Sequence, residues 1–212
     1  LMLTLLRKTH VSNSKMHQGE WERFFGRRLG EVTIGLIGMG RIGIGVLGRL
    51  QGFGCPRILV NDIEQKRFLE TAFKFEWSDK EEIYREADVI SLHVPLTKQT
   101  KGMIKKHELE LMKPESVLIN TARGGIIDEI DLYQVMKKGH LAGAAIDVFE
   151  QEPYNGALTE LERCHLTSHM GSMSIDCRTC MEVEATQEVV RFIKGQPLES
   201  VVPEVEYEAQ QT

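Results

Sequence analysis

The chain has 212 residues and a formal net charge of −5 at pH 7, with 42% hydrophobic and 27% charged residues. This length can bury one sizeable core, and the composition is that of an ordinary globular protein. The acidic balance gives no general attraction to nucleic acid or anionic lipid, and no apolar run reaches the ~20 residues that span a bilayer. We therefore expect no nucleic-acid partner and no membrane attachment.

The first 28 residues predict the end of a helix followed by a linker. Residues 1–8 have the character of last helical turns, and residues 10–28 are polar and turn-rich. Trp21, Phe24 and Phe25 are the expected anchors of this linker onto a neighbouring surface. A start on leucine rather than methionine suggests a fragment or a trimmed chain.

From residue 31 onward, short apolar runs alternate with segments of helical pattern. Strands that alternate with helices imply right-handed crossovers and a parallel sheet covered on both faces, and continuous apolar runs are typical of such strands. The predicted fold class is α/β, a Rossmann-type doubly wound parallel sheet with flanking N-terminal and C-terminal helices. The expected strands are 32–37, 58–61, 88–94, 116–121, 142–148 and 164–168, and the expected helices are 41–51, 64–72, 79–86, 103–112, 128–138 and 157–161.

A last, longer helix is expected from about residue 175 to residue 194. Gly195 and Pro197 end it, and the tail after Pro203 is acidic, polar and expected to be poorly ordered. One face of this helix repeats apolar residues at helical spacing, namely Met181, Ala185, Val189, Phe192 and Ile193.

Residues 32–62 have the pattern of a dinucleotide-binding unit: strand, three glycines, helix, strand and acid. Gly38 allows the sharp turn, Gly40 lets a pyrophosphate approach the backbone, and Gly43 lets the helix pack closely. Asp62 follows Gly43 by 19 residues, where a carboxylate accepts hydrogen bonds from a ribose and repels a 2′-phosphate, which favours NAD over NADP. The expected cofactor-binding residues of this unit are Gly38, Gly40, Arg41, Ile42, Gly43 and Asp62.

The cysteines raise the question of a zinc site. Cys177 and Cys180 form a C-x-x-C pattern near two histidines, but this segment is strongly helical and no second pair of ligands follows. We therefore expect no metal. The four cysteines, which include Cys55 and Cys164, are expected to be free thiols in a reducing, cytoplasmic location.

Three reactive side chains fall where predicted strands end, which is where open α/β sheets bind ligands. Arg123 offers a planar cationic fork for a carboxylate. His169 can exchange a proton with a carbonyl or hydroxyl oxygen, and Glu152 beside it favours the imidazolium and fixes its tautomer. With a hydride-carrying cofactor, these groups describe the reversible reduction of a 2-oxo acid to a 2-hydroxy acid. Simpler roles stay open: Arg123 as a helix cap or phosphate ligand, Glu152 as a solvated loop acid, and His169 as a structural histidine.

Five blocks of the chain, in one order, resemble the D-isomer-specific 2-hydroxyacid dehydrogenases, the family of D-3-phosphoglycerate dehydrogenase and glyoxylate/hydroxypyruvate reductase. They are residues 38–43 (GMGRIG), 93–97 (HVPLT), 120–125 (NTARGG), 145–149 (AIDVF) and 167–169 (TSH). The resemblance implies NAD as cofactor and Arg123, Glu152 and His169 as the catalytic residues. It also implies that Asp147 meets the nicotinamide carboxamide. The further cofactor-lining positions expected are Val94, Pro95, Thr100, Thr121, Ala122, Arg123, His169 and Gly171.

The chain departs from the family pattern in two ways. Ser168 stands where a proline usually precedes the histidine. Family members also begin with about a hundred further residues, the scale of one small substrate domain, and this segment is missing here. We therefore expect a linker remnant at 1–28, an NAD-binding domain at 29–173, and a C-terminal helix and tail at 174–212 that would pack on the absent domain. The resemblance further implies a homodimer, and it leaves one alternative open, a non-enzymatic NAD-sensing interaction module of the corepressor kind.

Overall fold

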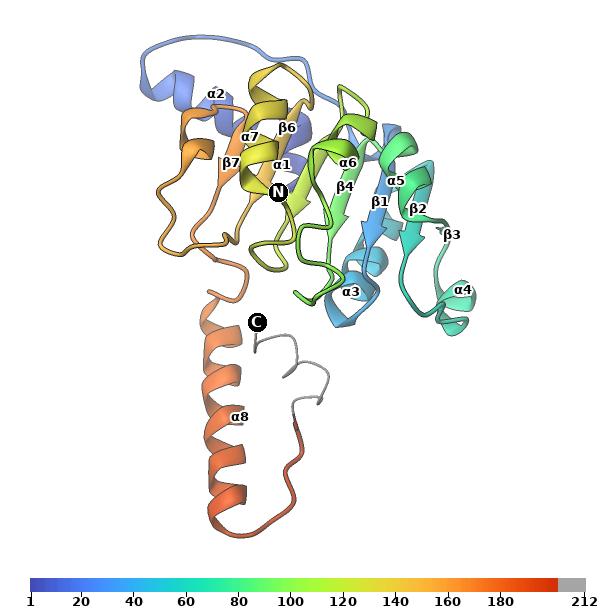
Figure 1. The fold of residues 1–212 in the computed structure, drawn as a ribbon, viewed down its shortest axis with the longest axis vertical. Coiled ribbons are helices and arrows are strands. Elements are labelled where there is room, and N and C mark those ends of the chain that lie inside the picture. The colour runs from blue at the N-terminus through green and yellow to red at the C-terminus, as the bar shows by residue number, and fades with distance from the viewer. Residues whose placement is uncertain (202–212) are drawn as a thin grey trace.

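A computed structural model of the chain describes residues 1–201 and shows one fully parallel sheet (Figure 1). The strand order is β3-β2-β1-β4-β5-β6-β7. The chain winds outward from β1 on one side and then returns to start β4 beside β1, so this doubly wound order reverses between these two strands. The prediction of the fold class is confirmed. The strands are β1 (Thr33–Ile37), β2 (Arg57–Asn61), β3 (Glu76–Trp77), β4 (Val89–Leu92), β5 (Val117–Asn120), β6 (Gly143–Ile146) and β7 (Cys164–Leu166).

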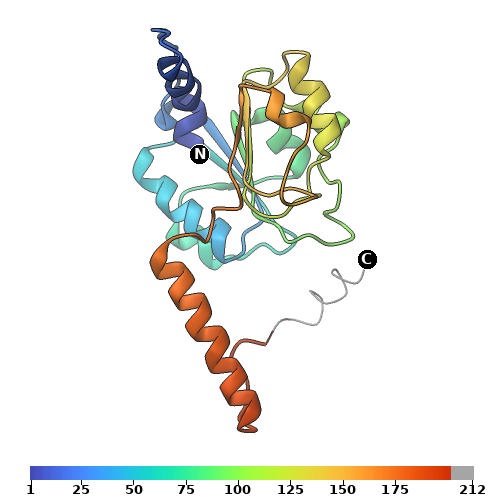
Figure 2. The ribbon, with the colours of Figure 1, turned by 90° about the vertical axis from the view of Figure 1, so that its left-hand side faces the viewer.

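Helices cover both faces of the sheet, as Figure 2 shows with the sheet seen from the side. One apolar cluster contains Leu5, Leu6 and Leu47 and packs the first and third helices on one face. The other contains Ile83, Leu109 and Leu132 and packs the fifth to seventh helices on the opposite face. The helices are α1 (Met2–Arg7), α2 (Thr9–His17), α3 (Arg41–Leu50), α4 (Phe68–Ala72), α5 (Lys80–Glu86), α6 (Lys106–Leu111), α7 (Glu129–Lys137) and α8 (Ile175–Ile193), with 3-10 turns η1 (Leu29–Glu31), η2 (Gln51–Phe53) and η3 (Ala157–Glu160).

The central strands are buried because helices lie on both of their faces. All residues of β4, β5 and β6 are buried, which explains why their sequences are mostly apolar, with Ser91 and Asn120 as the buried polar exceptions. Gly35 in β1 has a packing role, since a Cβ there would lie 2.5 Å from the Ile83 side chain. The absence of a side chain lets α5 approach the sheet closely.

Two parts of the sequence-based prediction are wrong. The strand β3 was not predicted, because it has only two residues and pairs through Leu59 and Val60 of its neighbour. The segment expected to be turn-rich contains α2, which buries Val11 alone and so gives no repeating apolar pattern.

The predicted anchors of the linker, Trp21, Phe24 and Phe25, are not fully buried by other residues in the described part of the chain. Trp21 is 80% exposed and Phe25 is 99% exposed, while Phe24 is half-buried. Residues 1–201 therefore do not cover Trp21 and Phe25.

The long helix α8 extends away from the sheet (Figures 1 and 2). None of its 19 residues is buried against the rest of the described chain. Phe192 and Ile193, members of the predicted apolar face, are among its most exposed side chains. The tail predicted after Pro203 lies outside the described residues. Across residues 1–201, no helix combines the length and apolarity needed to cross a membrane.

At the amino ends of the strands, the carboxylate of Asp88 ties the linker to the sheet. It accepts a hydrogen bond from the Thr33 N–H at 2.8 Å and pairs with Arg27 at 3.0 Å and Lys113 at 3.4 Å. Burial alone would raise the pKa of Asp88, but the Thr33 N–H and the two cations outweigh it and hold this pKa below its ordinary value. This edge is therefore fixed by charge pairs.

Candidate active site

The loops that follow the strands meet at the carboxyl edge of the sheet. The N–H of Gly38, just after β1, donates to the Asn61 carbonyl at the end of β2 at 2.8 Å. The N–H of His93, just after β4, donates to the Ile37 carbonyl at 2.7 Å. The strand-order reversal between β1 and β4 lies at this point, where doubly wound sheets have their ligand crevice.

The three glycines after β1 have different surroundings. Gly38 has φ +101°, and a Cβ there would lie 2.5 Å from the His93 carbonyl oxygen. A Cβ on Gly43 would lie 2.0 Å from the Gly38 carbonyl oxygen, so glycine is required for the helix to pack on the loop. A Cβ on Gly40 would meet nothing within 4 Å. The open position is therefore the one where a ligand can approach the backbone.

The helix α3 begins directly at this open position. Gly40 is its N-cap and provides no side-chain cap. The first N–H groups of a helix have no intrahelical partner and lie at its positive end. The first-turn N–H groups belong to Arg41, Ile42 and Gly43, and helix starts of this kind are where proteins commonly bind phosphates.

At the tip of β2, two side chains clamp the peptide groups around Met39. Asp62 Oδ2 accepts from the Met39 N–H at 2.5 Å, and its Oδ1 accepts from the Glu64 N–H at 3.2 Å. Lys66 Nζ donates to the Met39 carbonyl at 2.6 Å. A carboxylate has about four acceptor positions, so Asp62 keeps room for further donors. Lys66 gave no signal in the sequence, because a lysine four residues beyond the acid resembles any surface lysine.

The loop after β4 is held by its own threonines. Thr100 Oγ1 donates to the Pro95 carbonyl at 2.6 Å and accepts from the Thr97 N–H at 2.7 Å. Val94 lies against the glycine loop, since a Cβ on Gly38 would lie 2.9 Å from its side chain. His93 sits 3.0 Å from the Ser91 hydroxyl, and burial lowers its pKa to about 4. The His93 side chain is therefore neutral at pH 7.

After β5, a buried asparagine shapes the loop that carries Arg123. The Asn120 amide donates to the Arg123 carbonyl at 2.9 Å and accepts from the Ala122 N–H at 3.0 Å. Thr121 lies between them, half-buried. The Arg123 guanidinium is exposed and donates to the Ala122 carbonyl at 2.6 Å. Within residues 1–201 the guanidinium makes no ion pair with a carboxylate. The sequence did not identify Asn120, which the apolar pattern of the strand concealed.

Glu152 and His169 are in direct contact. His169 Nδ1 lies 2.9 Å from Glu152 Oε2, and Glu152 Oε1 accepts from the Phe149 N–H at 3.0 Å. The hydrogen bond with His169 and then that with the Phe149 N–H lower the pKa of Glu152. An ionised Glu152 only accepts hydrogen bonds, so Nδ1 carries the proton of the pair. The other ring nitrogen, Nε2, makes no hydrogen bond within residues 1–201, and the side chain is exposed.

The loop that presents His169 is fastened by the buried carboxylate of Asp147. Asp147 Oδ1 accepts from the Thr167 hydroxyl at 2.5 Å and the Met170 N–H at 2.8 Å, and Oδ2 accepts from the Gly171 N–H at 3.1 Å. The His169 N–H donates to the Asp147 carbonyl at 2.9 Å. His169 itself has φ +55°, a left-handed backbone that is uncommon for residues other than glycine. These bonds hold the strained turn in place.

The loops that carry Arg123 and Glu152 also touch. A Cβ on Gly124 would lie 1.9 Å from the Phe149 carbonyl oxygen, so the two loops pack backbone against backbone. The three predicted catalytic residues thus follow the neighbouring strands β5, β6 and β7 at one edge. The N–H of Glu150 in this cluster donates to Glu129 at 2.7 Å, and burial raises the pKa of Glu129.

The four cysteines lie apart from this edge or on α8, and all four are free thiols. Cys164 is buried in the core, where burial raises its pKa to about 12. Throughout residues 1–201, no three His, Cys, Asp or Glu side chains form a group that could hold a metal ion.

An α/β sheet with an open glycine loop, an uncapped helix start, an acid at the tip of β2 and a Glu–His pair defines a dinucleotide-dependent oxidoreductase fold. Comparison with known proteins gives the family. Residues 1–171 match the family described as D-isomer specific 2-hydroxyacid dehydrogenase, NAD binding domain. The chain belongs to this family, and the predicted family and the predicted cofactor, NAD, are both confirmed.

Named relatives and one solved structure are similar to this chain. Glyoxylate reductase of Thermococcus litoralis is 38% identical over 206 residues, which cover 92% of this chain and 62% of the relative. D-3-phosphoglycerate dehydrogenase of Methanocaldococcus jannaschii is 35% identical over 95% of this chain and 39% of the relative. A crystal structure of D-lactate dehydrogenase from Aquifex aeolicus with NAD and lactic acid has a TM-score of 0.84 at 29% identity, covering 92% of this chain and 64% of that one. The chain thus spans about three fifths of the length of the glyoxylate reductases it matches.

Proposed function

We propose that the chain is the cofactor-binding half of an NAD-dependent D-2-hydroxyacid dehydrogenase. The observation that carries this proposal is the contact of Glu152 with His169 at 2.9 Å, at the same sheet edge as the open glycine loop. An acid–base pair beside a dinucleotide site is what hydride transfer to a carbonyl requires.

In this proposal the carboxyl edge holds NAD along the strand ends. The N–H groups of Arg41, Ile42 and Gly43 hold the pyrophosphate, and Asp62 binds the adenosine ribose. The open position at Gly40 supports this role, because it leaves the backbone accessible. The remaining lining positions proposed are Gly38, Val94, Pro95, Thr100, Thr121, Ala122, Arg123, Asp147, His169 and Gly171.

The chemistry follows from the charges at this edge. When bound, NADH supplies the hydride. The guanidinium of Arg123 binds the substrate carboxylate and polarises the adjacent carbonyl. His169 Nε2 donates a proton to the carbonyl oxygen in reduction and accepts it in oxidation. Glu152 holds the tautomer through Nδ1 and stabilises the imidazolium charge.

The segments into which the chain divides support the presence of a second domain that binds substrate. We propose residues 1–28 as an interdomain helix and linker, 29–173 as the NAD-binding domain, and 174–212 as a segment that packs on a substrate domain. The exposed α8 is consistent with this arrangement, because an apolar face in water is stabilised by a covering surface. The substrate is a 2-oxo or 2-hydroxy acid, whose side chain the substrate domain selects.

We further propose a homodimer and a cytoplasmic location. Exposed Trp21 and Phe25 support the first, since large exposed aromatic side chains are typical of protein interfaces. Four free thiols support the second. Sedimentation velocity on the chain and on a Trp21→Ala, Phe25→Ala variant tests the dimer, which the double substitution should weaken.

Turnover tests the function. The intact two-domain protein should oxidise NADH in the presence of glyoxylate, hydroxypyruvate or another 2-oxo acid. If NADH binds but no member of such a panel is reduced, and a protein partner binds only when the nucleotide is present, the corepressor-like sensing module replaces the dehydrogenase.

A further inference from the structure

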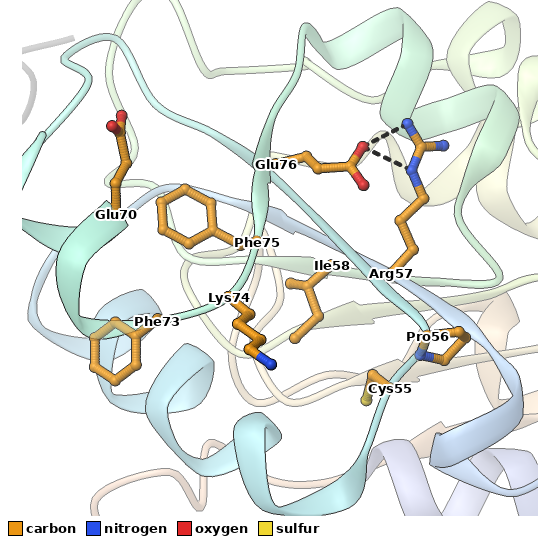
Figure 3. A pocket seen from close by; sticks show the side chains of 9 residues that line it. All are labelled: Cys55, Pro56, Arg57, Ile58, Glu70, Phe73, Lys74, Phe75 and Glu76. Atoms are coloured by element: carbon orange, nitrogen blue, oxygen red, sulfur yellow. Dashed lines mark hydrogen bonds and ion pairs between the residues drawn. The ribbon is translucent and has the colours of Figure 1, made fainter.

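A separate pocket lies at the opposite end of β2 from the cofactor loops. Its volume is about 450 Å³, and Figure 3 shows the side chains that line it. It opens between residues 55–58, which lead into the start of β2, and the segment that leads from α4 into β3. Small-molecule sites have volumes of roughly 300–1,000 Å³. The pocket is therefore of the right size for a small ligand, and nothing in the dehydrogenase chemistry uses it.

The walls of this pocket are fixed by hydrogen bonds and packing. The side-chain amide of Gln51 accepts from the Lys74 N–H at 2.9 Å and donates to the Lys74 carbonyl at 3.3 Å. Phe75 packs edge-on against Trp77, with ring centroids 5.1 Å apart. Lys74 is thus held by its backbone, which leaves its side chain independent of these contacts.

The charges in the pocket leave one cation available. Glu76 forms an ion pair with Arg57 at 2.8 Å, and Arg57 also forms one with Glu82 at 2.9 Å. Glu70 accepts from the Trp77 indole N–H at 2.8 Å and points away from the pocket centre (Figure 3). Among residues 1–201, the Lys74 ammonium makes no ion pair and no hydrogen bond.

Apolar side chains line the pocket beside this cation. Lys74 itself is exposed, Phe73 and Phe75 are half-buried, and Ile58 is buried. Ile58, Phe73 and Phe75 line the pocket with Lys74, and Figure 3 shows the Lys74 amine directed toward the side of the pocket formed by Cys55. An ammonium beside aromatic and aliphatic carbon attracts an anion that carries an apolar body, because such a ligand satisfies the charge and covers the apolar surface together.

We propose that this pocket is a binding site for a small monocarboxylate with an aromatic or branched aliphatic body. The carboxylate pairs with Lys74 and the apolar body lies on Ile58, Phe73 and Phe75. The site is distinct from the carboxyl edge, so its occupancy does not require turnover or NAD.

The probe is 3-phenylpropanoate, with the neutral 3-phenylpropanamide as its matched ligand. Isothermal titration calorimetry on the 212-residue chain should show saturable binding of the acid at one site. Lys74→Gln removes the charge and keeps the backbone contacts with Gln51, so it should weaken acid binding about tenfold, the change that ~1.4 kcal/mol produces. Lys138→Gln, which removes an exposed lysine at the end of α7, should bind the acid like the unchanged chain.

Alkylation of Cys55 gives a second readout at the pocket itself. In a Cys177→Ser, Cys180→Ser background, iodoacetamide reacts with Cys55 as the one thiol outside the core, since Cys164 is buried. Phenylpropanoate should slow this reaction severalfold, and phenylpropanamide should not. Filling the cavity with Cys55→Phe should abolish binding of the acid in calorimetry.

Three results would overturn the proposal. The first is equal binding of the acid and the amide, and the second is unchanged acid binding in Lys74→Gln. Either result would show that the carboxylate does not pair with Lys74. The third is a Cys55 alkylation rate that falls with rising protein concentration in the absence of any acid, which would make this face a contact between copies of the chain.

Discussion

Two carboxylates at opposite edges of the sheet, Asp88 partly buried and Asp147 buried, are satisfied in different ways. Asp88 at the amino edge is paired with two cations, Arg27 and Lys113. Asp147 at the carboxyl edge accepts from a hydroxyl and two backbone N–H groups, all neutral. The first joins the linker to the sheet, and the second holds the turn that presents His169.

This difference separates stability from function within one sheet. Charge pairs at the amino edge stabilise the folded chain. At the carboxyl edge neutral donors fix the loop, so the cationic Arg123 stays available for an anionic ligand. Each of the following predictions tests this separation.

The largest effect is expected at His169. If the proposed function holds, His169→Gln in the two-domain protein should lower turnover about 10²–10⁴-fold, the range for loss of a general acid–base group, while NADH affinity stays near normal. Stopped-flow reduction of glyoxylate and fluorescence titration of NADH measure the two quantities. The matched control is His107→Gln, an exposed histidine on α6. Turnover of His169→Gln close to that of the control would remove His169 from the mechanism.

The next effect is expected at Asp147. Asp147→Asn presents an amide donor to partners that are themselves donors, so the turn at His169 loosens. Turnover should fall about tenfold to hundredfold, because small displacements of a reacting group are that costly. Hydrogen exchange at residues 167–171 should rise in parallel. A variant with lost turnover and unchanged exchange would contradict a positioning role for Asp147.

A smaller effect is expected at the ribose end of the cofactor site. Asp62→Ala should weaken NADH binding about tenfold and relax discrimination against NADPH, since a charge-assisted acceptor is lost and a 2′-phosphate is no longer repelled. Fluorescence titration with both nucleotides measures the ratio. Lys66→Met is the companion variant, and it tests the loop clamp without removing the acid. Unchanged nucleotide selectivity in Asp62→Ala would count against the ribose role.

The smallest functional effect is expected at Asp88. Asp88→Asn should lower the free energy of unfolding by about 1–3 kcal/mol and leave NADH binding intact, because it removes one partner of a partly buried ion pair. The pKa of Asp88 lies below its ordinary value of 3.8, so its contribution is present above that pH and is lost as the pH falls through the folded pKa. Urea denaturation at pH 7 and at successively lower pH should show the difference between variant and parent shrinking in acid. If the difference in the free energy of unfolding grew in acid, ionised Asp88 would not be the stabilising form.

The doubly wound parallel sheet could be predicted because strands covered on both faces are mostly apolar and the glycine pattern marks the first turn. The elements β3 and α2 were not predicted because they lack such a pattern. The two residues of β3 are too few to show a period, and α2 buries one apolar side chain, Val11, so neither left a pattern to detect.

The placement of Arg123, Glu152 and His169 at one edge of the sheet could be predicted, because strand ends collect ligand-binding side chains; their catalytic roles stay predictions. Their supports could not be predicted. Asn120 and Asp147 act through hydrogen bonds to backbone groups that are distant along the chain or hidden in a turn, and Lys66 acts on a carbonyl 27 residues earlier. Such contacts depend on the three-dimensional course of loops, which residue type and spacing do not determine.

The central claim is that one dinucleotide lies along the carboxyl edge, from Asp62 to His169. A crystal structure of the chain with NADH tests this most directly. We predict the pyrophosphate on the N–H groups of Arg41 to Gly43, the adenosine ribose on Asp62, and the nicotinamide ring between Arg123 and the Glu152–His169 pair. A nucleotide bound elsewhere on the chain, with the first turn of α3 free of phosphate, would contradict the account.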